Sequence, residues 1–244
     1  GSVNLALKAG EAAMGAQLFD YAGYIVDTYV AEKNLSDKEY DRAMAIIDLL
    51  DPYYTARNAV DEALAELGDG ANDPENIRNA LRKLLENPAN DKTILYFYLG
   101  NMAASLEEGL EYMALASENE AFTYPLAVYG NMLRRSQQFD RARELYRKAQ
   151  DKNACDTSAL IGLGVLELLN GDKTQGLELI RQADDMTPFN LYIPEALIIA
   201  LCENGQRETA LALKADKEAQ QYEFDPELQE YLDGEITLRD YYIG

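Results

Sequence analysis

The chain has 244 residues and a formal net charge of −21, because 43 acidic residues outnumber 22 basic ones, and 48% of its residues are hydrophobic. This charge argues against nucleic acid as a ligand, since affinity for nucleic acid depends on Lys and Arg that neutralise phosphates. The apolar content is high enough for a folded core. Histidine is absent, and Cys155 and Cys202 have no CxxC spacing. His-based nucleophilic pairs, His-containing zinc sites and a disulfide framework are therefore excluded, and we expect neither a metal nor another cofactor.

Membrane insertion is not expected. The longest runs without charge, Thr93–Leu106 and Ala121–Leu133, are shorter than the roughly 18–20 apolar residues that a membrane span needs. No signal peptide is visible, but Gly1-Ser2 (residues 1–2) reads as an expression scar, which leaves a natural leader or anchor before it open. We expect a cytoplasmic protein, and the alternative is the soluble domain of an anchored or exported protein truncated at its N-terminus.

Residues 3–92 are interpreted as degenerate helical repeats. Ser36 suits the N-cap of a helix from Asp37 to Leu50, and a further helix is expected over Glu75–Glu86. The pair Asp-Pro occurs twice in this segment, at Asp51-Pro52 and Asp73-Pro74. In each pair the aspartate suits the N-cap of a helix and the proline suits its first turn. These signals predict helices that start anew at residues 51 and 73.

The helical pattern is clearest in the segment 93–221. The stretch Asp140–Gln150 places apolar residues on one helical face, at Ala142, Leu145, Tyr146 and Ala149. Turn signals at Asn170-Gly171 and Asn204-Gly205 predict that hairpins close near residues 171 and 205. Sustained strand patterns are missing, so the whole chain is expected to be all-α.

Glycines recur at a spacing typical of stacked helical hairpins, since Gly130 and Gly164 lie 34 residues apart. The segment 93–219 resembles the tetratricopeptide repeat family, which places small residues where its paired helices touch. Three successive units carry such positions: Gly130, Ala142, Tyr146 and Ala149; Leu160, Gly164, Ile180, Ala183 and Pro188; Leu201, Gly205 and Ala210.

An earlier unit fits if the turn between its helices is shortened, and its residues are Leu99, Gly100, Gly109, Met113 and Ala116. Upstream the pattern weakens to single matches at Gly10, Phe19, Asp20, Ala22 and Val26. The resemblance implies one continuous all-α, right-handed superhelical solenoid of antiparallel helical hairpins, with about 12–15 helices.

Residues 222–244 depart from the repeat. Asp225-Pro226 predicts the start of a short helix. An apolar face follows, formed by Leu228, Tyr231, Leu232, Ile236, Leu238, Tyr241 and Tyr242. Because the last repeat of a solenoid exposes a hydrophobic surface, we expect this segment to provide C-terminal capping helices. A tail that docks onto a partner is the alternative.

In the tetratricopeptide family the first helix of each hairpin lines a concave groove that binds peptide segments. The resemblance predicts nine groove residues in this chain: Phe97, Tyr98, Asn101, Tyr124, Asn131, Arg134, Arg135, Tyr192 and Glu195. The tripeptide Gly-Asn-Met occurs at 100–102 and at 130–132, so two asparagines would project into the groove and hydrogen-bond a ligand backbone. The alternative is that both are merely solvated polar positions. The two arginines would hold an anionic end of the ligand.

Motifs for catalysis are missing. There is no GxxxxGK[ST] phosphate loop and no GxSxG, and carboxylate pairs such as Glu107 and Glu111 are expected by chance among 43 acidic residues. We therefore expect a non-catalytic interaction module or scaffold that binds a peptide or protein segment. The 17 tyrosines support an alternative, a surface-tethered protein that binds glycans or other small polar molecules. The identity of the partner and the oligomeric state stay open.

Overall fold

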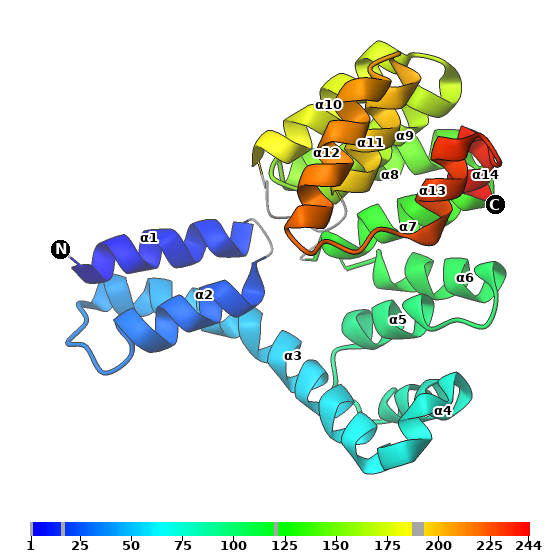
Figure 1. The fold of residues 1–244 in the computed structure, drawn as a ribbon. Coiled ribbons are helices and arrows are strands. Elements are labelled where there is room, and N and C mark those ends of the chain that lie inside the picture. The colour runs from blue at the N-terminus through cyan, green and yellow to red at the C-terminus, as the bar shows by residue number, and fades with distance from the viewer. Residues whose placement is uncertain (1, 16–17, 120–121, 187–192) are drawn as a thin grey trace. The chain divides into compact units, whose positions relative to one another are not determined.

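A computed structural model describes residues 2–15, 18–119, 122–186 and 193–244 of the chain (Figure 1). In these residues the chain forms fourteen α-helices, one π-helical turn and one 3-10 helix, and no strand. The predicted all-α fold of helical hairpins is thereby confirmed. Two compact units follow one another, unit 1 (Gly1–Pro125) and unit 2 (Leu126–Gly244). No helix within the described ranges is both long and apolar enough to cross a membrane.

Unit 1 contains the helices α1 (Ser2–Gly15), α2 (Phe19–Ile25), the π-helical η1 (Val26–Val30), α3 (Asp37–Leu67), the 3-10 helical η2 (Gly68–Asn72), α4 (Pro74–Leu84), α5 (Lys92–Asn101) and α6 (Leu106–Ala116). Two clusters of buried residues lie in the described part of its core. One joins α1, α2, η1 and α3 through buried residues that include Leu7, Ala22, Val26 and Ile46. The other joins α3, α4 and α5 through Val60, Leu81, Leu95 and Leu99.

Helix α3 differs from the prediction. It starts at Asp37 as predicted, because the Glu39 carboxylate accepts a hydrogen bond from the Ser36 amide at 3.0 Å in a capping box. However, the helix runs through Pro52 to Leu67, so the predicted end at Leu50 and the new start at Asp51 are wrong. Proline removes one helical hydrogen bond. Burial on both sides of it compensates, at Ile46, Leu50, Ala56 and Val60.

The second Asp-Pro signal does start a helix. The Asp73 carboxylate accepts a hydrogen bond from the Glu75 amide at 2.9 Å, and Pro74 occupies the first turn of α4. The helix expected over Glu75–Glu86 is therefore present, with bounds at Pro74 and Leu84.

Unit 2 contains most of α7 (Tyr124–Arg135), which begins at the boundary, followed by α8 (Phe139–Lys152), α9 (Thr157–Asn170), α10 (Lys173–Met186), α11 (Ile193–Glu203), α12 (Arg207–Ala219), α13 (Pro226–Asp233) and α14 (Leu238–Ile243). The turns after α9 and α11 fall where the sequence predicts them. Gly171 (φ 92°) and Gly205 (φ 72°) adopt the left-handed conformation that favours glycine, and each ends the first helix of a hairpin.

Small residues bring the paired helices of unit 2 into close contact, as the repeat pattern predicts. The ring of Tyr146 on α8 is fully buried and lies where a side-chain methyl at Gly130 or Gly162 would overlap it. In the next hairpin the backbones of Gly164 on α9 and Gly176 on α10 approach each other directly. The fold therefore depends on glycine at these contacts.

The last two helices pack on the core of unit 2. Leu228 and Leu232 on α13 are buried in a cluster with Ile198 and Leu201 of α11, and Tyr241 and Tyr242 on α14 pack against the same cluster. The predicted start at Asp225 is confirmed, since its carboxylate accepts a hydrogen bond from the Glu227 amide at 3.0 Å.

Candidate functional site

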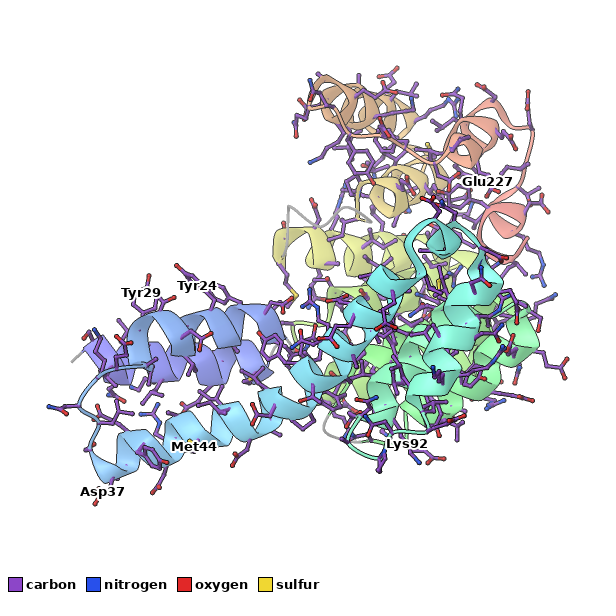
Figure 2. All side chains as sticks on the ribbon, turned by 90° about the horizontal axis from the view of Figure 1, so that it is seen from below. Tyr24, Tyr29, Asp37, Met44, Lys92 and Glu227 are labelled. Carbon is purple, nitrogen blue, oxygen red and sulfur yellow. The ribbon has the colours of Figure 1, made fainter. Side chains whose placement is uncertain are left out.

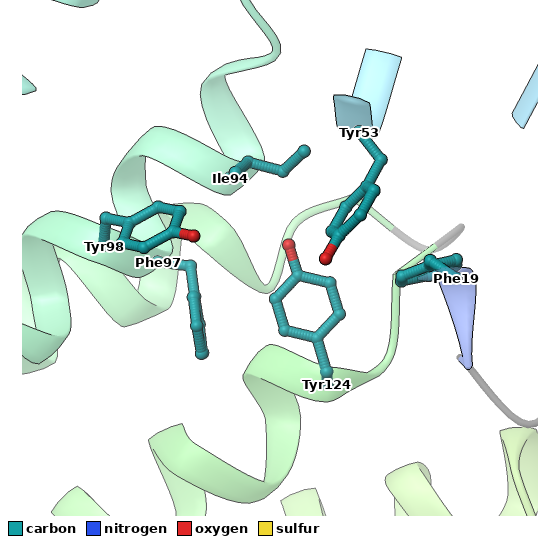
Figure 3. A pocket seen from close by; sticks show the side chains of 6 residues that line it. All are labelled: Phe19, Tyr53, Ile94, Phe97, Tyr98 and Tyr124. Atoms are coloured by element: carbon teal, nitrogen blue, oxygen red, sulfur yellow. The ribbon is translucent and has the colours of Figure 1, made fainter. Parts of the chain in front are cut away.

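Three of the predicted groove residues, Phe97, Tyr98 and Tyr124, line one cavity of about 180 Å³ in unit 1 (Figure 3). The other lining residues are Phe19, Tyr53 and Ile94, so five of the six side chains are aromatic. We call this feature the aromatic cavity. It is the candidate site because predicted residues from two helices meet there.

Helix α5 supplies one wall of the aromatic cavity. Its first turn is capped by Asp91, whose carboxylate accepts a hydrogen bond from the amide of Ile94 at 3.3 Å. Ile94 is buried and lines the cavity. Helical spacing then places Phe97 and Tyr98, three and four residues further on, on the same face.

The aromatic rings hold one another in place. The rings of Phe97 and Tyr124 meet edge to face, with centroids 4.8 Å apart and planes at 89°. Phe19 lies edge to face with Tyr124 at 6.1 Å, and its centroid is 4.8 Å from that of Tyr53. Edge-to-face contacts of this kind are favourable beyond the area they bury. The cavity wall is thus a continuous aromatic network.

Three tyrosine hydroxyls add polar atoms to the mainly apolar lining of the aromatic cavity. Figure 3 shows the hydroxyls of Tyr53, Tyr98 and Tyr124 directed toward its interior. Burial raises the pKa of Tyr124, and the nearby Asp91 carboxylate adds to the effect. Burial and then Asp20 raise the pKa of Tyr53, against a smaller opposing effect of Arg57. Near neutral pH Tyr53 and Tyr124 are therefore uncharged hydrogen-bond donors and acceptors.

A charged pair lies beside the Tyr53 wall. The Arg57 guanidinium is 2.5 Å from an Asp20 carboxylate oxygen and donates a longer hydrogen bond, of 3.4 Å, to the Tyr53 hydroxyl. The hydrogen bond to Asp20 raises the pKa of Arg57. Since Asp20 neutralises this cation, the arginine positions Tyr53 rather than offering an unpaired charge.

Sequence reasoning missed Phe19 and Tyr53 as site residues. Phe19 opens α2 and matches the weak upstream repeat, but its partners come from helices far along the chain. Tyr53 follows Pro52, where the sequence predicts the start of a new helix instead of the interior of α3. The sequence offered one signal for Tyr53, the aromatic doublet Tyr53-Tyr54. In the structure Tyr53 lines the cavity, whereas Tyr54 packs against Gly23.

The other predicted residue of unit 1, Asn101, does not line the aromatic cavity. It is exposed at the end of α5, and its side-chain amide donates a hydrogen bond to the carbonyl of Phe97 at 3.0 Å. The structure thus places the asparagine one turn beyond the cavity, on the same helix.

Three of the predicted residues of unit 2, Asn131, Arg134 and Glu195, have hydrogen-bond partners within the protein. Asn131 accepts a hydrogen bond from the Tyr146 hydroxyl at 2.7 Å, Arg134 donates one to the carbonyl of Tyr242 at 2.8 Å, and Arg135 is exposed. Glu195 accepts hydrogen bonds from the amide of Asp225 and from the Tyr241 hydroxyl. Tyr192 lies outside the described residues.

A second group of tyrosines is exposed on unit 1. Tyr21 (58% exposed), Tyr24 (55%) and Tyr29 (52%) lie on α2 and η1, and Figure 2 shows Tyr24 and Tyr29 projecting outward. The rings of Tyr21 and Tyr24 are nearly parallel at 6.4 Å, and Tyr24 meets Tyr29 edge to face at 6.2 Å. A hydrogen bond with Tyr24 raises the pKa of Tyr29. We call these three residues the tyrosine surface.

Within the described ranges, no three His, Cys, Asp or Glu side chains come together as a group that could hold a metal ion. The two thiols are unpaired, Cys155 exposed and Cys202 half-buried, and burial raises the pKa of Cys202. A thiol with a raised pKa is a poor nucleophile.

The buried small residues and the short hairpin turns give the chain an all-α helical-repeat fold that is like that of tetratricopeptide repeats. No family model and no curated protein sequence matches the chain. Among solved structures, one described as MamA is similar with 16% identity and a TM-score of 0.49, and the match covers 62% of this chain and 93% of that one. A tetratricopeptide repeat protein from Parabacteroides merdae ATCC 43184 is similar with 14% identity and a TM-score of 0.45, over 99% of this chain and 88% of that one.

Proposed function

We propose that the chain is a non-catalytic interaction module that holds a peptide or protein segment by one large apolar or aromatic side chain in the aromatic cavity. The observation that supports this is a partly open cavity of about 180 Å³ that is lined mainly by aromatic rings. An apolar cavity of roughly 150 Å³ accommodates benzene, whereas sites for complete small ligands span about 300–1,000 Å³. The aromatic cavity therefore suits one side chain better than a whole substrate or cofactor.

The lining chemistry defines the partner segment further. Tyrosines combine a large apolar contact area with a polar tip, which is why they are frequent among the residues that dominate binding energy. The net charge of −21 steers basic partners toward the protein. We therefore expect an aromatic or large aliphatic anchor with Lys or Arg nearby, and the exposed Asn101, one turn beyond the cavity on α5, is a candidate contact for the rest of the segment.

Selection from a random peptide library, followed by affinity measurement, tests this proposal. Enriched peptides should share one large apolar residue beside basic ones. Tyr98→Ala should weaken binding by about 2 kcal/mol or more, roughly thirtyfold, as expected for a central tyrosine. Tyr96→Ala is the matched control, because Tyr96 lies on the same helix and stacks on Tyr112 at 6.2 Å without lining the cavity.

Circular dichroism must show that both variants stay folded. A library that yields no peptide above background would refute the proposal. Equal losses of affinity in the two variants would refute it as well, because the effect would then come from general damage to α5.

The tyrosine surface supports a second candidate function, the binding of glycans or other small polar molecules. Its three rings are more than half exposed and adjacent, so that their apolar faces and hydroxyls are both available to a ligand. Glycan-array binding that is lost in Tyr24→Ala and kept in Tyr40→Ala, an equally exposed tyrosine of α3, would favour this function. Array signals that are equal for the two variants would count against it.

A further inference from the structure

The C-terminal segment of the chain, residues 225–243, contacts the first helix of each of three hairpins in unit 2, α7, α9 and α11 (Figure 1). Glu195 on α11 ties both ends of this segment. Its carboxylate accepts hydrogen bonds from the Asp225 amide at 2.8 Å and from the Tyr241 hydroxyl at 3.2 Å. The tail thus lies where the repeat pattern predicts a binding groove.

Arg134 on α7 holds the last helix of the tail. Its guanidinium donates a hydrogen bond to the carbonyl of Tyr242 at 2.8 Å and lies over the ring of the same residue, 5.1 Å from the centroid. The negative end of the helix dipole attracts a cation, and so does the face of an aromatic ring, so both interactions favour this position of the guanidinium. At the other end of α11, Glu203 accepts a hydrogen bond of 2.7 Å from Tyr231.

The tail has the features of a docked ligand. Helices α13 and α14 have 8 and 6 residues, far fewer than an isolated helix needs, so their helical structure depends on docking. They follow a non-helical connection with the exposed residues Gln221, Glu223 and Asp225. Such a connection allows the segment to leave the surface without breaking the hairpins.

The fit of the tail is also incomplete. In the described part of the chain, two buried polar atoms where the end of the tail meets α7 have no hydrogen-bond partner, the Tyr242 hydroxyl and Nε of Arg134. Unsatisfied buried polar atoms cost free energy. A segment that satisfies both atoms would bind this surface better than the tail does.

We propose that this surface of α7, α9 and α11 binds a partner's helical segment that ends in two adjacent tyrosines, and that the chain's own residues 225–243 occupy it in cis until such a partner displaces them. This proposal uses the role of an interaction module but a surface separate from the aromatic cavity. The expected partner has the chemistry of the tail. Its first tyrosine would donate a hydrogen bond to the Glu195 carboxylate, as Tyr241 does, and its second would lie under the Arg134 guanidinium, as Tyr242 does. The backbone carbonyl at its helix end would accept a hydrogen bond from Arg134.

A fluorescent peptide of residues 222–244 is the probe, and the full chain is the receptor in fluorescence anisotropy. In wild type the tail competes in cis and the peptide should bind weakly. In a Tyr241→Ala/Tyr242→Ala chain, where the tail is released, the peptide should bind at least tenfold more tightly. Adding Arg134→Gln should abolish the gain, whereas adding Arg135→Gln, the exposed neighbour on α7, should leave it unchanged.

Hydrogen exchange provides the control for folding. In the double tyrosine variant the amides of 226–243 should lose protection while those of α9–α11 keep theirs. Equal peptide affinity for wild type and double variant would overturn the proposal, and so would loss of protection throughout α9–α11, which would make the tail an integral part of the core. A stable wild-type dimer in sedimentation velocity would overturn occupation in cis, because a second copy would then supply the tail.

The peptide experiment is independent of the aromatic cavity. Tyr98→Ala in the double tyrosine background should leave peptide affinity unchanged, so a failure of the aromatic-cavity proposal and a failure of this one can be told apart.

Discussion

Gly164→Ala should destabilise the chain, although alanine is the better helix former. A Cβ atom at residue 164 would lie 2.7 Å from Cγ1 of Ile180 and 3.0 Å from the carbonyl oxygen of Gly176, both on α10. The approach is reciprocal, since a Cβ at Gly176 would lie 2.8 Å from the carbonyl oxygen of Gly164. Because backbone atoms have no rotamer to change, α9 and α10 would have to move apart.

Gly15→Ala provides the reference for the magnitude. Gly15 ends α1, and no atom lies within 4 Å of the position its Cβ would take. Replacing glycine by alanine at an unstrained helical position stabilises by about 0.5–1 kcal/mol, while overpacking a close contact costs about 1–3 kcal/mol. Because the gain from alanine at a helix end is at most that in a helix interior, the difference between their free energies of unfolding is a lower estimate of the steric cost. Gly164→Ala should therefore be about 1–3 kcal/mol less stable than Gly15→Ala.

Urea unfolding followed by far-UV circular dichroism measures this difference, and hydrogen exchange locates it. The loss of protection in Gly164→Ala should be greatest in α9 and α10, where the backbones meet. If Gly164→Ala were as stable as Gly15→Ala, the close approach of the two glycines would not exist in solution. The reasoning on small residues in the repeat would then fail.

Two further predictions concern α3 and the tail. Pro52→Ala should stabilise α3 by about 1–3 kcal/mol, because it restores a helical hydrogen bond to the carbonyl of Asp48. Unchanged or lower stability in urea unfolding would argue that α3 is broken at this point. Burial alone would raise the pKa of Glu203, but hydrogen bonds from Lys173 and Tyr231 outweigh it and lower the pKa. This stabilisation is complete above the ordinary glutamate pKa and disappears as the pH falls through the lowered value. Wild type should thus lose its stability advantage over Glu203→Gln as the pH falls from above the ordinary glutamate pKa to below the lowered one, and a pH-independent difference in Tm would contradict this.

Local signals of the sequence predicted the fold well. Gly171 and Gly205 end helices because the left-handed conformation is costly for other residues, and Asp73 and Asp225 cap helices because a carboxylate accepts from the backbone within two residues. Each of these interactions lies within a few residues of chain. The hairpin pattern could therefore be predicted without knowledge of the tertiary structure.

Features that depend on tertiary packing were not predictable in this way. Pro52 is a helix-breaking signal that burial along α3 overrides, and the aromatic cavity joins Phe19 and Tyr53 to Tyr124 across more than half of unit 1. The contact of Arg134 with Tyr242 spans 108 residues. Nothing in the local pattern distinguishes this arginine from Arg135, its exposed neighbour, and only the position of the tail does.

The hydrogen bonds from the arginines that hold the tail give the surface of unit 2 little power to discriminate between sequences. Arg134 donates to the carbonyl of Tyr242 near the end of α14, and Arg207 donates to the carbonyl of Leu232, at 2.5 Å, near the end of α13. Every residue type offers a backbone carbonyl, and helix ends attract cations in any sequence. These two contacts therefore recognise helix termini, and specificity must reside in side chains. Tyr231 and Tyr241 provide it, because their hydroxyls meet the two carboxylates of α11 and no aliphatic residue could replace them there.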